Sequence, residues 1–138
     1  MVCNADGPSF PVYDPVSGKM VVLWMQWAGT NMYFQTVGVS GTTLTAGTIT
    51  TRSGTYSAYY KMERNQVDNK IYAVVLSSAS PQDAIIHEIT ISGSTATLDS
   101  GFEYVTDSSP TLPYYNTMAI DTSSNKVVAV YAPGSSYS

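Results

Sequence analysis

Charged residues and cysteine are both scarce in this sequence. Only 12% of its 138 residues are charged, about half of the share that is usual in globular proteins. The single cysteine, Cys3, excludes an intrachain disulfide and a cysteine-rich metal site. The six basic residues are scattered and the net charge is −4, so the concentrated cationic face that binds nucleic acid is missing. We therefore expect no nucleic-acid partner.

Long apolar runs are missing too. The run from Met20 to Met25, as long as any in the chain, is far too short to span a membrane. The first residues show no basic stretch followed by an apolar one, so we expect no signal peptide. We also expect no membrane insertion.

The residues of strands and tight turns are abundant instead. Apolar residues make up 43% of the chain, which is enough for a core. Thr, Tyr, Val and Ile favour pleated sheets, and Gly, Ser, Asn and Asp favour turns. No segment shows a sustained helical period. This composition predicts an all-β fold and is typical of virion or extracellular proteins, where we expect this chain to be located.

Three segments share one pattern: a strand, a polar turn, a lysine and an apolar run. The lysines, Lys19, Lys70 and Lys126, lie 51 and then 56 positions apart. Five positions before each lysine is an Asx residue whose side chain is expected to bond its own turn, and the pair just before each lysine suits positive φ. The Asx residues are Asp14, Asn65 and Asp121, and the pairs are Ser17–Gly18, Asp68–Asn69 and Ser124–Asn125.

A second hairpin signal repeats in step with the first. Val39–Leu44 (VSGTTL) is matched 52 positions later by Ile91–Ala96 (ISGSTA). Each complete unit is therefore predicted to contain four strands, within one β-repeat domain over residues 1–138. The units span about 9–53 and 54–108, with a half unit at about 113–133. The expected strands are about 9–13, 19–27, 31–39, 43–52, 56–64, 70–78, 83–91, 95–106, 114–121 and 126–132.

The run after each lysine is apolar at successive positions, so we expect it to be covered on both faces. Repeats of four-stranded antiparallel units, stacked as β-propeller-like blades at about two and a half per chain, account for this pattern. A two-sheet β-sandwich is the alternative. It explains the number of strands but not the repeat near 52 residues.

Two motifs carry a resemblance to a known group of proteins. Tyr13 to Val22 has the pattern YDPxSGKMVV, and Val39 to Thr48 has the pattern VSGTTLTxGT. From about residue 9 to 132, the chain resembles the blade repeats of tail-fibre-like and other structural proteins of bacteriophages, marine and cyanobacterial ones in particular. The resemblance implies a β-propeller-like virion or surface-binding component and supplies no catalytic residues. Members of that group carry many blades, whereas this chain carries about two and a half.

Residues that could carry chemistry are isolated. His87 is the only histidine and has no triad-like partner spacing. Asp99, Glu103 and Asp107 are expected to be solvated acids, and no nucleotide-binding or nucleophile-elbow motif is present. We therefore predict that the protein is not an enzyme, with no catalytic, cofactor-binding or metal-binding residues and no cofactor.

Paired tyrosines and the last apolar strand are the remaining candidate contact residues. Neighbouring residues of a strand point to opposite faces, so one tyrosine of each pair is free to stack on a sugar or a partner protein. The half unit leaves an apolar flank and an unpaired edge, which invite pairing. The tyrosines are Tyr59, Tyr60, Tyr114 and Tyr115, and the assembly edge is Val127, Val128, Val130 and Tyr131.

Two functions follow from these expectations. The first is a structural or interaction protein of a phage virion (a tail, fibre or capsid surface) that assembles through strand edges and blade faces. It would form a homo-oligomer or dock on other virion proteins, and head-to-tail contacts would permit a ring or a filament. The alternative is a lectin-like module that oligomerises into a propeller and binds surface glycans.

Overall fold

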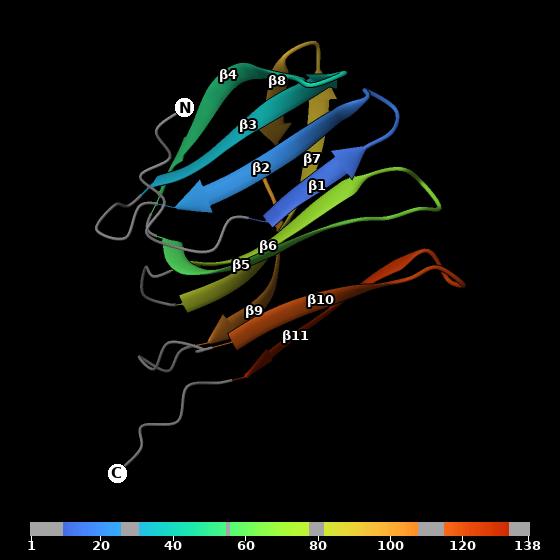
Figure 1. Ribbon diagram of the computed structural model, residues 1–138. Helices are drawn as coiled ribbons and strands as arrows, with labels where there is room; N and C mark the ends of the chain where they lie inside the picture. Colours follow the sequence, from blue (N-terminus) through green and yellow to red (C-terminus); the bar gives the residue numbers. More distant parts are fainter. Residues whose placement is uncertain (1–9, 26–30, 55, 78–81, 108–114, 133–138) are drawn as a thin grey trace.

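The computed structural model describes residues 10–25, 31–54, 56–77, 82–107 and 115–132, and every regular element in these ranges is a β-strand. The strands form three antiparallel sheets (Figure 1). The first sheet has the order β1-β2-β3-β4, and the second has the order β5-β6-β7-β8 with β9 also paired to β7. The third is a hairpin of β10 and β11. The strands are β1 Phe10–Asp14, β2 Lys19–Met25, β3 Asn31–Ser40, β4 Thr43–Ser53, β5 Tyr56–Arg64, β6 Ile71–Ser77, β7 Gln82–Ser92, β8 Thr95–Leu98, β9 Phe102–Asp107, β10 Tyr115–Asp121 and β11 Lys126–Ala132.

The all-β prediction and the antiparallel four-stranded arrangement are confirmed, with one correction. The segment 95–106, expected as a single strand, is two strands, β8 and β9. Both pair with β7, β8 through Ile89–Ser92 and β9 through Gln82–Ile86. Together they occupy the place that the single strand β4 holds beside β3. The interruption falls at Asp99–Gly101, where Gly101 has a φ of +83° and the backbone leaves the ladder.

The turns before the lysines have the predicted chemistry. Gly18, Asn69 and Asn125 all have positive φ, which glycine and asparagine adopt at little cost. The Asx side chains accept hydrogen bonds from backbone amides of their own turns. These bonds are Val16 N to Asp14 Oδ1 (3.1 Å), Val67 N to Asn65 Oδ1 (2.9 Å) and Ser123 N to Asp121 Oδ1 (3.0 Å).

The pairing register recurs from unit to unit. Tyr13 pairs with Met20, Arg64 with Ile71 and Ile120 with Val127, each pair flanking the lysine turn in the same way. Deeper in the sheets, Leu23 pairs with Phe34 as Val74 pairs with Ile86. Side chains alternate between the two faces along a strand. Because the register is shared, equivalent residues of different units point to the same side of their sheets.

The second sheet lies between the first sheet and the hairpin (Figure 1). We define face A of a unit as the side that carries Tyr60, Met62 and Ala73 in the second sheet, and face B as the opposite side, which carries Lys61 and Val74. In the first sheet, face A carries Tyr13, Met20 and Val22, and face B carries Val12, Val21 and Leu23. In the hairpin, face A carries Met118 and Val127, and face B carries Val128 and Val130.

Strand β6 is the centre of the molecule. Ala73, Val74, Val75 and Leu76 have no exposed surface, so both faces of this strand are covered, as its continuous apolar sequence predicts. One face packs on the first sheet and the other on the hairpin.

Equivalent valines of β6 and β11 should therefore respond differently to a charge. Val74→Asp buries an unpaired carboxylate, which we expect to cost more than about 4 kcal/mol and to leave the chain largely unfolded. Val130→Asp should stay folded and lose much less stability than Val74→Asp, because Val130 is 57% exposed. Circular dichroism melts of the two variants measure this difference, and equal losses of stability in both would contradict the burial argument.

Candidate functional site

The contact between the first and second sheets joins face B of one to face A of the other. Its apolar core includes Leu23 and Phe34 from the first sheet and Met62, Ala73 and Ile89 from the second. These side chains are at most 5% exposed. Burial of this apolar surface is the main force that holds the two sheets together.

Tyr60 adds a polar link inside this contact. Its side chain is 4% exposed, and its hydroxyl donates to the carbonyl of Leu23 at 3.2 Å. Burial raises the pKa of Tyr60 to about 12, so the hydroxyl keeps its proton at neutral pH. Tyr60 thus packs between the sheets in the described structure.

A bulge at Gly47 and Thr48 of β4 makes the second link. The pairing of β3 with β4 shifts by one residue there. The backbone N–H of Thr48 and the hydroxyl of Thr36 both donate to the carbonyl of Ser94, at 3.0 and 2.7 Å. Ser94 lies in the turn between β7 and β8, so the bulge of one sheet docks on a turn of the next.

Arg52 provides a third link beside it. From β4, its guanidinium donates to the carbonyl oxygens of Asp99 (2.8 Å) and Ser100 (3.3 Å). These residues lie where β8 gives way to β9. The break in the outer strand of the second sheet therefore supplies the carbonyl acceptors for the first sheet.

His87 and Gln35 are counterparts in the two sheets. The Gln35 amide donates to the carbonyl of Gly47 at 2.7 Å. His87, 52 positions later, places Nδ1 3.2 Å from the carbonyl of Asp99, the counterpart of Gly47. A carbonyl oxygen only accepts, so neutral His87 carries its proton on Nδ1. Its buried Nε2 has no hydrogen-bond partner among the described residues.

The surroundings of His87 disfavour its cation. Its side chain is fully buried, and this burial lowers the pKa of the imidazole below its ordinary value of 6.5. The positive charge of Arg52 lowers the pKa further, whereas the Asp99 carboxylate, 3.4 Å from Nδ1, opposes the shift. His87 is therefore neutral at pH 7 in the folded chain.

The hairpin packs on the second sheet in the same way, with its face A against face B of the second sheet. Met118, on face A of the hairpin, is 2% exposed. Lys61, on face B of the second sheet, donates to the carbonyl of Met118 at 2.6 Å. At the turn end of the same contact, the Asn65 amide donates to the Asn125 side-chain oxygen at 2.6 Å, which ties the two lysine turns together.

Uncovered apolar surface lies at both ends of this stack. Val128 and Val130, on face B of the hairpin, are 49% and 57% exposed. On face A of the first sheet, Tyr13 is 55% and Leu44 is 70% exposed, although Ala96, the counterpart of Leu44, is fully buried in the second sheet. The faces that meet inside the molecule are thus the faces left open at its ends.

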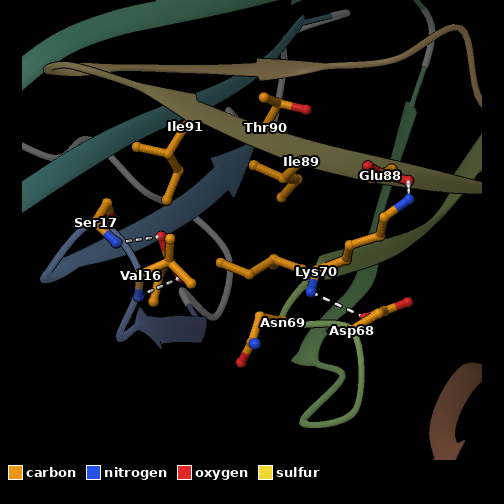
Figure 2. A pocket seen from close by; sticks show the side chains of 11 residues that line it. Val16, Ser17, Asp68, Asn69, Lys70, Glu88, Ile89, Thr90 and Ile91 are labelled. Atoms are coloured by element: carbon orange, nitrogen blue, oxygen red, sulfur yellow. Dashed lines mark hydrogen bonds and ion pairs between the residues drawn. The ribbon is translucent and has the colours of Figure 1, made fainter.

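A pocket of about 250 Å³ lies between the lysine turns of the first two units (Figure 2). Val16, Ile89 and Ile91 face it, and Asp68 and Glu88 stand at its rim (Figure 2). The rim carboxylates already have partners in the chain. Glu88 pairs with Lys70 Nζ at 2.8 Å, and Asp68 accepts from the backbone N–H of Lys70 and the hydroxyl of Tyr72. We assign no ligand to this pocket.

The predicted contact residues fall in different environments. Val128 and Val130 are exposed, whereas Val127 is half-buried on face A of the hairpin. Tyr59 and Tyr115 lie in β5 and β10, and Tyr131 lies in β11, but their side chains are outside the described part of the chain. Tyr114 is outside it entirely, as are the side chains of Glu103 and Asp107.

The described residues contain no group of three or more His, Cys, Asp or Glu side chains placed to hold a metal ion. Within the same residues, no helix has the length and apolarity needed to cross a membrane.

The polar links between the sheets were not anticipated from sequence. Arg52, Thr36 and Thr48 look like ordinary residues of polar strands. One signal was available: glycine in the middle of a strand often marks a bulge, and Gly47 lies five residues after the β3–β4 turn.

At Gly47, the contact between the two sheets leaves no room for a side chain. A Cβ there would overlap the Thr36 hydroxyl and the backbone carbonyl of Ser94. We expect Gly47→Ala to destabilise the chain by about 1–3 kcal/mol. Gly38→Ala is the matched control, because its Cβ would lie 3.8 Å from the nearest atom, the Thr45 oxygen. Urea unfolding of both variants measures the effect, and an equally stable Gly47→Ala variant would contradict this docking geometry.

His87 should make stability depend on pH. The folded-state pKa lies below 6.5, so protons bind more tightly to the unfolded chain. The stabilising effect of neutral His87 is complete above pH 6.5 and is lost as the pH falls towards the folded-state pKa. His87→Gln should keep the carbonyl bond, as Gln35 does, without this dependence. We expect the melting temperature of the wild type to fall more between pH 7.5 and 5.5 than that of His87→Gln, and parallel curves would contradict this.

No protein-family model, curated protein sequence or solved structure matches the chain. The geometry of the chain itself, and above all that of the two outer faces of the stack, is what indicates a function.

Proposed function

We propose that this protein is a non-enzymatic structural protein whose units stack like the blades of a β-propeller. It joins a larger assembly through the faces left uncovered at the two ends of the stack. A virion, in its tail, fibre or capsid surface, is the setting that the sequence resemblance implies.

The exposure of one repeated position carries this proposal. Leu23, Val74 and Val130 occupy the same place in the three units. The first two have no exposed surface, whereas Val130 is 57% exposed. Fully burying a valine is worth about 1.5–3 kcal/mol, so covering Val130 and its half-exposed neighbour Val128 would favour association.

The edge of β11 supports the same function. In the complete units, β2 and β6 each pair with strands on both sides. Within the described residues, β11 pairs with β10 alone. A strand edge without a partner presents backbone N–H and C=O groups to another chain, so the hairpin offers both an apolar face and a hydrogen-bonding edge.

Sedimentation equilibrium of the purified chain over a range of concentrations tests the proposal. We expect the wild type to associate and Val130→Asp to shift towards the monomer, because the charge would be buried in the contact. Val67→Asp is the matched control. Val67 is 51% exposed but lies in the β5–β6 turn, away from face B of the hairpin, so this variant should associate like the wild type.

Two results would contradict the proposal. One is a wild-type chain that is monomeric at every concentration. The other is saturable binding on a glycan array that is lost in Tyr59→Ala or Tyr114→Ala, which would favour the lectin-like alternative.

A further inference from the structure

The two internal contacts of the stack are made in the same order, with face A of one unit packed on face B of the unit before it. Face A of the second sheet packs on face B of the first sheet, through Met62 and Ala73 against Leu23. Face A of the hairpin packs on face B of the second sheet, through Met118 beside Lys61. Each unit therefore offers face A to the unit before it and face B to the unit after it.

One face of each kind is left without a partner unit in the described structure. Face A of the first sheet exposes Tyr13 at 55%, and face B of the hairpin exposes Val128 and Val130. These surfaces belong to the strands that meet in the internal contacts, since β10 packs mainly against β5 and β5 packs against β1.

We infer that a second copy of the chain covers these surfaces, with face A of its first sheet packed on face B of the hairpin of the preceding copy. This inference rests on the proposed function and specifies its partner. The contact between copies continues the internal stacking, so β1 and β2 of one copy lie against β10 and β11 of the preceding copy. It is a heterologous contact, and its repetition yields a ring or an open filament.

The charge distribution suits this contact. The described strand residues on face A of the first sheet carry no charge. On face B of the hairpin, Asp121 and Lys126 stand at the turn end, and Thr117, Ala119, Val128 and Val130 form an uncharged centre. The uncharged centre of the hairpin and face A of the first sheet therefore meet without the cost of desolvating an ion.

Complementation between two blocked variants tests the inference. Tyr13→Asp blocks face A of the first sheet and leaves the hairpin intact, and Val130→Asp does the reverse. Each variant by itself should lose at least about tenfold in association constant, which is about 1.4 kcal/mol. An equimolar mixture should form a 1:1 heterodimer and nothing larger, because it contains one intact face A and one intact face B.

The outcomes separate this inference from the proposed function. If Val130→Asp is monomeric but Tyr13→Asp associates like the wild type, the hairpin binds something other than face A, and the inference fails while the proposed function stands. If both variants are monomeric and their mixture is monomeric too, the head-to-tail contact is also wrong. If Val130→Asp associates like the wild type, the inference and the proposed function fail together. Val67→Asp should match the wild type throughout, and melting curves confirm that each variant is folded.

Discussion

The packing of one apolar sheet face on the next is the interaction on which the rest of this structure depends. A four-stranded antiparallel sheet of this size cannot bury both of its faces by itself. The second sheet solves this problem by lying between two neighbours, and β6 is accordingly the most completely buried strand. The first sheet and the hairpin each pack on the second sheet through one face, and their exposed apolar residues lie on the opposite side, where Trp24 and Val37 of the first sheet are nevertheless buried.

Polar contacts fix the relative position of the stacked sheets. Apolar burial is non-directional, so by itself it would allow the sheets to slide. The contacts to the carbonyl groups of Ser94 and Asp99 are directional, and they come from Thr36, Thr48 and Arg52 in the first sheet. The bulge at Gly47 and the strand break at Asp99–Gly101 bring these carbonyls within reach. The bulge and the strand break thus fix the position of one sheet relative to the other.

Much of the fold could be predicted from the sequence because its signals are local. The turns at Gly18, Asn69 and Asn125 depend on residues within a few positions, and their φ values agree with the prediction. The division of 95–106 into two strands was missed because Gly101 permits a break without requiring one. The links made by Arg52 and Thr36 could not be predicted, since they join residues 47 to 58 positions apart that become neighbours only after the sheets stack.

At the candidate site, the exposure of Val128 and Val130 in β11 could not be predicted from the local sequence either. The sequence predicts that Val128 and Val130 belong to an apolar strand, but their exposure depends on whether another layer lies over them. Tyr60 is the opposite case, since its hydroxyl could have faced a ligand and instead bonds the backbone of the neighbouring sheet. Burial is a property of the stack, which local patterns do not encode.

The position of the hairpin at one end of the stack has a consequence for cooperativity. In a linear array, each layer is stabilised chiefly by the layers it touches, so the end layers open more easily than the middle one. The hairpin touches one neighbour, whereas the second sheet touches two. Amide hydrogens of β10 and β11 should therefore exchange with solvent through a local opening that leaves β6 protected, and any partner that covers the hairpin would slow this exchange without changing the rest of the chain.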